Sequence, residues 1–347
     1  MPEITAPAKV LVTGSSSFIA IWVVRYLLEC GFSVRGAVRS EDKGKHLLDT
    51  FKDAVSKGMF ELAIVPDMCA PGAFDEAVKG VTAIEHTASP VHANADDPNE
   101  IIVPAIRGTL GVLESALKYA GPQIKRVVVT SSCAAIFSSS PQGELDETCW
   151  NEECLNEVNE KGRLASAINK YRASKTLAEK AAWKFVEDHK DEINWDLVTI
   201  NPPYVFGPIL HQVKGIDTLN VSSLWFYNAL FSKDESISKD TLHDILLPRG
   251  WVDVRDVANA HVRALTTPGA GGQRFIISAG SNSWKDWSDV AIDLHIEGIK
   301  RYETGSEPVP KVGRYNASKS REVLGIKYRE MKDIAKDTIQ SFKEHGW

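Results

Sequence analysis

Tyr171 and Lys175 have the side-chain types and the spacing of an acid–base pair. They lie four residues apart in a segment with helical periodicity, so they share one face of a helix. A phenol with a pKa near 10 is a poor acid or base at neutral pH, but a neighbouring ammonium favours the phenolate and lowers that pKa. The pair could therefore exchange a proton with a reacting oxygen. The alternative is a surface pair without chemistry.

Ser132 could supply the third group of such a site. The apolar segment Arg126–Ser131 is typical of a buried strand, and Ser132 directly follows it. Open parallel sheets bind ligands at the carboxyl ends of their strands, where a hydroxyl could hydrogen-bond a carbonyl and stabilise a developing oxyanion. The helix that carries Tyr171 and Lys175 follows this strand, so the three side chains could meet in one crevice. The alternative is a serine that bonds only its own turn.

Residues 14–17, Gly-Ser-Ser-Ser, connect the first expected strand, Lys9–Thr13, to the first expected helix, Phe18–Cys30. Backbone N–H groups at a helix N-terminus favour a bound pyrophosphate. The usual dinucleotide fingerprint has glycines at positions that correspond to 14, 17 and 20, whereas only Gly14 is a glycine here. A buried strand followed by a helix is nevertheless the context that dinucleotide binding requires. A serine-capped turn without a ligand is the alternative.

The end of the second expected strand, Ser33–Val38, distinguishes two cofactors. An Asp or Glu at this place would bind the ribose 2′-hydroxyl of NAD, but Arg39 follows the strand and Lys43 is close behind. A guanidinium fork and an ammonium suit a 2′-phosphate. The sequence therefore predicts NADPH rather than NADH, with a solvated surface arginine as the alternative.

The elements that must position these residues alternate through the first two hundred residues. Further strands are expected at Glu61–Val65, Ala83–His86 and Asp196–Asn201, and helices near Lys43–Ser56, Ala73–Lys79, Asn99–Ala120 and Leu164–His189. This alternation predicts an α/β fold, a doubly wound parallel sheet of the Rossmann type. After Asn201 the pattern is irregular, with a helical stretch at Val252–Leu265 and a strand at Arg274–Ser278. We expect a cofactor domain over residues 1–203, to which 251–279 returns, and a smaller mixed α/β substrate domain over 204–347.

Composition excludes several classes of function. The 347 residues are 43% hydrophobic and 25% charged, with a net charge of −6 and no basic block, which argues against nucleic acid and membrane surfaces as partners. The N-terminus lacks the pattern of a secretory signal, and the longest apolar run, Phe18–Leu28, is too short to span a bilayer. Five scattered cysteines indicate neither a disulfide framework nor a metal site. We expect a cytoplasmic protein, monomeric or homodimeric.

Seven segments in family order and spacing make the sequence similar to the extended short-chain dehydrogenase/reductases. Within them it resembles the branch of dihydroflavonol 4-reductases, fungal methylglyoxal reductases and yeast-type carbonyl or aldehyde reductases. The segments are VLVTGSSSFIA (10–20), VRGAVRS (34–40), HTASP (86–90), VVVTSSCAA (127–135), YRASKTLAEKAAW (171–183), NPPYVFGP (201–208) and WVDVRDVANAH (251–261).

The resemblance implies a catalytic set and a cofactor. Ser132, Tyr171 and Lys175 match the family's serine, tyrosine and lysine: the tyrosine protonates the alkoxide formed by hydride transfer, the serine orients the carbonyl, and the lysine also bonds the nicotinamide ribose. NADPH/NADP+ is expected to contact the phosphate loop and the ends of the successive strands. These positions are Gly14, Ser16, Ser17, Phe18, Ile19, Arg39, Lys43, Asp67, Met68, Thr87, Ala88, Ser89, Thr130, Tyr171, Lys175, Pro202, Pro203 and Val205.

Family geometry also implies a substrate pocket, formed by Val91, Phe137, Tyr204, Ser223, Trp225 and Phe226. An apolar, aromatic-lined pocket suits hydrophobic aldehydes and ketones, with methylglyoxal, aromatic ketones and ketoesters as candidates. The alternative is that the aromatic residues 225–227 are core of the small domain. The histidines at 211, 243 and 261 have no partner in the sequence, and we expect them to be structural.

Three functions remain open. The main one is an NADPH-dependent carbonyl reductase; the others are a flavonoid- or steroid-type dehydrogenase and a non-catalytic NADP(H)-sensing protein. Ser17, which would crowd a phosphate loop, favours the sensor, whereas the combination of Ser132, Tyr171 and Lys175 favours an enzyme. Arg39 argues against a sugar-nucleotide epimerase, which would favour NAD. The family's fourth catalytic residue, an asparagine, has no match on the helix Asn99–Ala120, where Pro104 lies near its place.

Overall fold

The main sheet has seven parallel strands. The computed structural model describes residues 4–89, 95–139, 143–232, 247–302 and 314–347. The strand order is β3-β2-β1-β4-β5-β6-β9, and all six neighbouring pairs are parallel. This is the predicted doubly wound Rossmann sheet. Its strands are β1 Lys9–Thr13, β2 Ser33–Val38, β3 Phe60–Ile64, β4 Ala83–His86, β5 Arg126–Thr130, β6 Asp196–Asn201 and β9 Gln273–Ile276.

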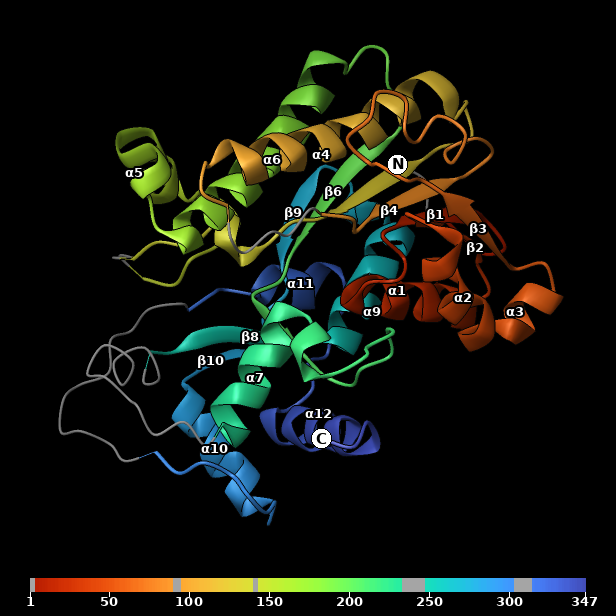
Figure 1. Cartoon of the computed structure of the whole chain (residues 1–347). Helices are drawn as coiled ribbons and strands as arrows, with labels where there is room; N and C mark the ends of the chain where they lie inside the picture. The colour runs from red at the N-terminus through yellow and green to blue at the C-terminus, as the bar shows by residue number, and fades with distance from the viewer. Residues whose placement is uncertain (1–3, 90–94, 140–142, 233–246, 303–313) are drawn as a thin grey trace.

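Helices cover both faces of this sheet, which is why its strands are apolar on both sides. In β1, Val10 and Val12 belong to the core beneath α1 (Phe18–Glu29) and α9 (Val254–Thr266). Leu11 faces the other core, beneath α4 (Asn99–Tyr119) and α6 (Ala167–Asp188). Figure 1 shows the two helix pairs on opposite sides of the sheet. The alternation of side chains along a strand thus builds two cores from one short sequence.

A smaller mixed sheet lies below the main one in Figure 1. Its order is β10-β8-β7, with β7 (Tyr204–Phe206) parallel to β8 (Arg249–Asp253) and β10 (Gly280–Asn282) antiparallel to β8. The helices around it are α7 (Val221–Phe231), α10 (Trp284–Asp293) and α12 (Met331–Glu344). Aromatic side chains, among them Phe206, Phe226, Trp287 and Phe342, form their common core.

Shorter elements complete the described chain. They are α2 Glu41–Thr50, α3 Lys52–Ser56, α5 Glu152–Lys161, α11 Ser318–Val323, and the 3₁₀ turns η1 Cys133–Ala135, η2 Gly162–Leu164, η3 Ile216–Thr218 and η4 Pro268–Ala270. None of the helices in the described ranges is long and apolar enough to cross a membrane.

Two expectations about local structure were wrong. The segment Ala73–Lys79 forms successive turns instead of a helix, since Gly72 and Gly80, both at positive φ, bracket a stretch too short for stable helix. Val252–Asp253 belongs to β8, and the helix begins only at Val254. There the Asp253 carboxylate accepts a hydrogen bond from the Arg255 backbone N–H at 2.7 Å, which caps the helix.

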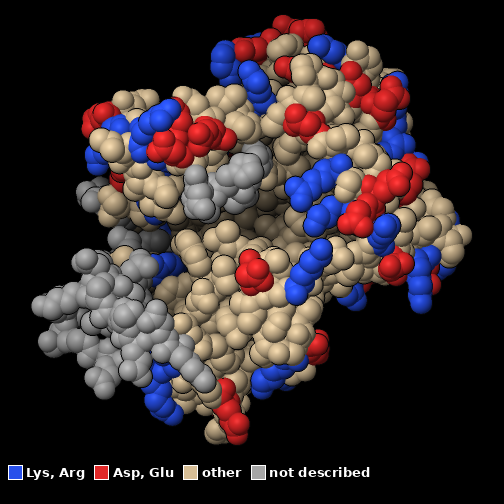
Figure 2. All heavy atoms as spheres, viewed as in Figure 1, with Lys and Arg blue, Asp and Glu red and all other residues tan. Residues whose placement is uncertain are grey.

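A hollow separates the part built on the main sheet from the part built on the small sheet. Figure 2 shows it on the face seen in Figure 1, with Lys and Arg side chains gathered at its right end. β5 and β6 end and α6 begins between these two parts. The residues that directly follow those strands are therefore candidates for a functional site.

Candidate active site

The backbone around Ser132 is held by the neighbouring strand. Beyond the end of β5, the Cys133 N–H donates to the Pro202 carbonyl at 2.9 Å, which extends the pairing with the segment after β6. The Ser132 hydroxyl accepts from the Ala134 N–H at 3.0 Å and donates to the Pro202 carbonyl at 3.4 Å. The second bond is long, so a better acceptor could replace it without cost to the fold.

Tyr171 lies on the first turns of α6 and reaches this serine. The helix starts at a defined point, because the Ser166 hydroxyl caps the Asn169 N–H at 3.3 Å. Burial raises the pKa of the Tyr171 phenol, and nearby Tyr204 adds to the rise, while a hydrogen bond with Ser132 lowers it in part. At neutral pH Tyr171 is therefore a protonated phenol, the form that can donate.

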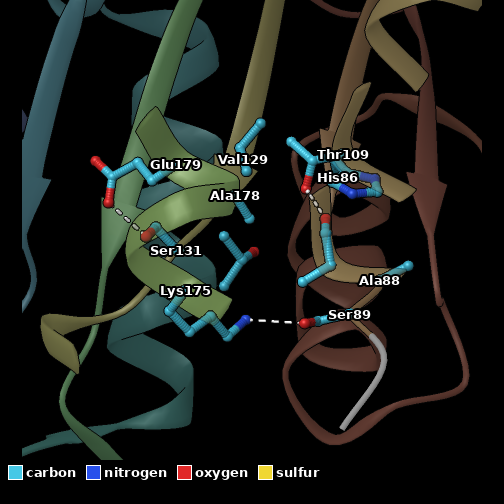
Figure 3. A pocket seen from close by; sticks show the side chains of 11 residues that line it. His86, Ala88, Ser89, Thr109, Val129, Ser131, Lys175, Ala178 and Glu179 are labelled. Carbon is cyan, nitrogen blue, oxygen red and sulfur yellow. Dashed lines mark hydrogen bonds between the residues drawn. The ribbon is translucent and has the colours of Figure 1, made fainter. Parts of the chain in front are cut away.

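Lys175 follows one turn later and donates from Nζ to the Ser89 hydroxyl at 3.0 Å, as Figure 3 shows. Burial lowers the pKa of Lys175 to about 8, against the opposing charge of Glu179. The expectation that this ammonium lowers the pKa of Tyr171 was wrong for the protein without its cofactor. Burial dominates, and the lysine is bonded to the turn after β4 instead.

Glu179 forms a buried network directly behind Ser132 and Lys175. This side chain, fully buried on the next turn of α6, accepts hydrogen bonds from Ser131 Oγ at 2.5 Å, Thr199 Oγ1 at 3.0 Å and Asn201 Nδ2 at 2.8 Å. The Asn201 amide also donates to the Ser132 carbonyl at 3.3 Å. The carboxylate thus ties α6 to the ends of β5 and β6.

Arg274 on β9 is the counter-ion of this carboxylate. Its Nε donates to Glu179 Oε1 at 2.6 Å, and the guanidinium lies 3.7 Å from the ring centroid of Trp150. Sequence reasoning missed this pair, which lies behind the site. The sequence feature that could have pointed to Glu179 is its spacing, four residues after Lys175 on the same helix face.

The phosphate loop is built so that β4 can approach it closely. Gly14 has a φ of +62°, and a Cβ at this residue would come within 2.9 Å of the Ala88 Cα. The Ala88 N–H donates to the Thr13 hydroxyl at 3.1 Å, and Thr87 bonds the Thr13 carbonyl, which holds the two turns together. Ser17 has a φ of −87°, so the fold itself does not need a glycine there.

Arg39 and Lys43 lie beside this loop at the end of β2. Arg39 is exposed, and Ser40 caps the first turn of α2 by accepting from the Lys43 N–H at 3.4 Å. Neither cationic group has an ion pair or hydrogen bond with any residue in the described part of the chain. Two cations thus flank the loop without a carboxylate to neutralise them.

Comparison with known proteins now decides the family. A family model described as the NAD dependent epimerase/dehydratase family matches residues 10–280. The chain belongs to that family. The resemblance to the extended short-chain dehydrogenase/reductases is thereby confirmed.

Curated members of the family extend over nearly the whole chain. A ketoreductase of Aspergillus niger, azaE, is 38% identical over 351 residues, covering 97% of this chain and 98% of that protein. An NADPH-dependent methylglyoxal reductase of Saccharomyces cerevisiae is 32% identical over 345 residues, covering 95% and 96%.

Solved structures of family members agree with the fold. The structure of Gre2 from Candida albicans in complex with NADPH superposes with a TM-score of 0.85 at 33% identity, covering 97% of this chain and 99% of that one.

The other expected cofactor residues lie in several different parts of the structure. Asp67 is exposed and accepts from the Cys69 N–H at 2.9 Å, while Met68 packs against α4. The Thr130 hydroxyl lies 3.1 Å from His261 Nε2, and Thr130 also lines the small cavity beside Lys175. Of the remaining positions, Ser16 precedes α1, Phe18 and Ile19 are its first residues, Pro203 lies between β6 and β7, and Val205 is within β7.

The expected substrate residues divide into two groups. Tyr204 stacks near Trp225, with ring centroids 5.5 Å apart, and Trp225 is 40% exposed. Phe226 is fully buried in the aromatic core, as the core alternative expects for it, and Ser223 is also fully buried. Val91 lies outside the described residues.

Two residues that sequence reasoning missed stand beside Phe137. Arg172 places its guanidinium 3.7 Å from the Phe137 ring centroid. Tyr315 lies close to Cys133, Arg172 and Tyr204, and burial raises its pKa strongly. The substrate side is therefore less apolar than the family resemblance implied.

A small cavity of about 20 Å³ lies behind Lys175, between β4, α4 and α6 (Figure 3). Its lining includes His86, Ser89 and Glu179, and burial beside Lys175 lowers the pKa of His86 to about 3. His86 is therefore neutral, and its Nδ1 contacts the Thr13 hydroxyl at 3.0 Å.

The remaining histidines lie apart from the reacting groups. His261 is fully buried, with its Nδ1 2.6 Å from Glu85 Oε2, so it has a partner that the sequence could not reveal. His211 packs against Phe18, and burial lowers its pKa to about 4. His243 lies outside the described residues. Within the described ranges, no three His, Cys, Asp or Glu side chains gather as metal ligands would.

Proposed function

We propose that the protein is an NADPH-dependent carbonyl reductase that converts aldehydes and ketones to alcohols. One observation carries the proposal: a buried, protonated Tyr171 is hydrogen-bonded to Ser132, one helical turn from Lys175. This arrangement places a proton donor, an orienting hydroxyl and an ammonium in one crevice. A sensor would need none of the three together.

The residues around the phosphate loop fit NADPH. The close approach of Ala88 to Gly14 and the free N-terminus of α1 form a cradle for a pyrophosphate, and a 2′-phosphate would neutralise Arg39 and Lys43. The printed names of the S. cerevisiae relative and the C. albicans structure support the same cofactor. When bound, NADPH supplies the hydride to the carbonyl carbon.

The chain's own residues supply the remaining chemistry. Ser132 exchanges its long bond to Pro202 for the substrate carbonyl oxygen and orients it. Tyr171 then donates its proton to that oxygen as negative charge develops there, a contribution on the order of 10²- to 10⁴-fold in rate. Lys175 leaves Ser89 to bind the ribose hydroxyls, which brings its positive charge next to the phenol.

The substrate is a small carbonyl compound with an apolar part. Phe137 and the neighbouring rings of Tyr204 and Trp225 would cover an apolar substituent of the substrate. Methylglyoxal, aromatic ketones and ketoesters are the candidates, and the names of the two curated relatives support this class. We expect the active form to be a monomer or a homodimer.

The test is the oxidation of NADPH and NADH, followed by absorbance with methylglyoxal, an aromatic ketone, a ketoester and a dihydroflavonol. We expect turnover with NADPH well above NADH on at least one of the first three. NADPH binding without turnover on any carbonyl would favour the sensor instead. Turnover restricted to the dihydroflavonol would favour the flavonoid-type dehydrogenase.

A further inference from the structure

Arg172 directly follows the catalytic tyrosine, Tyr171, in sequence. It is part-buried, its guanidinium lies over the Phe137 ring at 3.7 Å, and Nη1 donates to Asn169 Oδ1 at 3.0 Å. Both partners are neutral. No carboxylate in the described ranges comes within ion-pair distance of it.

Four other buried or part-buried arginines of this fold are neutralised by carboxylates. Arg126 pairs with Asp196, Arg274 with Glu179, Arg329 with Asp256, and Arg255 with Asp253 and Asp337. Taking a charge out of water costs free energy unless a counter-charge offsets it. Arg172 has no ion pair with a carboxylate among the described residues to offset that cost.

The nearest acidic group does not neutralise Arg172. Glu153 on α5 acts on it only through space, because its oxygens accept from Ser138 Oγ at 2.6 Å and from the Ser139 N–H at 3.0 Å. The other groups that face Arg172 are Cys154, Tyr204 and Tyr315. Burial raises the pKa of Cys154 and of Tyr315, so neither of these two groups supplies a negative charge at physiological pH.

We propose that Arg172 binds an anionic substituent of the carbonyl substrate, namely the carboxylate of an oxo acid. A planar guanidinium matches a carboxylate with two parallel hydrogen bonds. Its neighbour in sequence protonates the reacting oxygen, and its ring partner, Phe137, covers the substrate. This inference rests on the proposed reductase function and names the substrate class within it.

The test compares benzoylformate with its methyl ester, which replaces the carboxylate charge by a neutral ester, and the ratio of the two in each variant is compared with the ratio in wild type. At saturating NADPH, wild type should show a higher kcat/KM for the acid than for the ester. Arg172→Gln should lower kcat/KM for the acid about tenfold to hundredfold and leave the ester within about threefold. Arg172→Lys, which keeps the charge but not the fork, should retain part of the preference.

A second measurement needs no variant. Benzoate should inhibit reduction of the ester competitively with the oxo substrate, and it should do so more strongly than benzyl alcohol. Added salt should weaken the inhibition by benzoate only.

Three outcomes would overturn the inference. An equal loss on acid and ester in Arg172→Gln would mean that Arg172 only supports the Phe137 ring. A wild-type preference for the ester together with equal inhibition by benzoate and benzyl alcohol would exclude anion binding. Reduction of neither compound, nor of any other carbonyl, while NADPH still binds would instead show that the reductase function itself is wrong.

Discussion

The polar groups behind Ser132 and the cations that face the cleft are held in opposite ways. Glu179 is fully buried and receives hydrogen bonds from four neighbours and from the guanidinium of Arg274. Arg39 and Arg172, by contrast, have no carboxylate partner in the described part of the chain. The charged groups of the first region are paired within the protein, whereas the cations of the second region can pair with an anionic ligand.

This difference separates positioning from binding. A fully paired buried network holds the ends of β5, β6 and α6 in one arrangement, so the catalytic groups need no rearrangement when charge develops. A guanidinium without a counter-ion gains most when an anion arrives. Substitutions in the first region should therefore lower kcat or stability, and substitutions in the second should weaken the binding of an anionic ligand.

The largest effect is expected from Tyr171→Phe, which tests whether the positioned region performs the chemistry. Removing the proton donor should lower kcat about 10²- to 10⁴-fold, while NADPH binding and thermal stability stay close to wild type. Steady-state kinetics and a fluorescence titration with NADPH give the two readouts. Carbonyl reduction at the wild-type rate would show that Tyr171 is not the donor.

Arg274→Met should destabilise the protein by removing the counter-ion from the network around Glu179. It leaves the Glu179 carboxylate buried without its counter-ion, which destabilises a protein by about 3–5 kcal/mol. Thr199→Val is the matched control, since it removes one hydrogen bond to the same carboxylate and should cost about 0.5–1.5 kcal/mol. Urea unfolding compares them, and equal losses would mean that the buried charge pair contributes nothing special.

Arg39→Ala should affect binding alone. We expect the dissociation constant for NADPH to rise about tenfold to hundredfold and that for NADH to stay within about threefold, because only NADPH carries the 2′-phosphate. Lys45→Ala, on the neighbouring helix α2, is a control, since Lys45 is exposed and paired with Asp42. A parallel loss for both cofactors would refute the assignment of Arg39.

The smallest effect concerns pH and Lys175, where the two regions meet. Its pKa of about 8 lies below the ordinary 10.5 because of burial, so the ammonium is present below pH 8 and is lost above it. NADPH affinity should be constant from pH 7 to 7.5 and fall by up to about tenfold by pH 9. Lys175→Arg, always charged, should abolish the fall, whereas unchanged affinity of wild type up to pH 10 would contradict this role.

The same pKa has a consequence for folding stability. The unfolded chain binds a proton at Lys175 up to about pH 10.5, and the folded one only up to about pH 8. Between these values the unfolded state holds more protons, so this group's contribution to the free energy of unfolding rises with pH.

The main sheet could be predicted because its strands are short apolar runs separated by helical periods. The sequence pattern wrongly predicted a helix at Ala73–Lys79, which glycines flank on both sides. The pattern also could not decide which aromatic residue of α7 faces solvent: Trp225 is exposed and Phe226 is core. That choice depends on how the helix packs against α10 and α12.

The reacting groups could be predicted from residue types alone, but their supports could not. Tyr171, Lys175 and Ser132 have recognisable spacing and strand-end placement. Arg274 is 95 residues from Glu179 in sequence, and a glutamate on a helix is usually exposed. Arg172 was missed for a similar reason, since only the tertiary structure shows that it lies over Phe137 without a counter-ion.

A crystal structure of the NADPH complex tests the central claim most directly. The account predicts that Arg39 binds the 2′-phosphate and that Lys175 exchanges Ser89 for the ribose. The Ser132–Tyr171 contact and the bonds of Glu179 should remain as they are. A 2′-phosphate away from Arg39, or a rearranged Glu179 network, would contradict the division between positioned and binding groups.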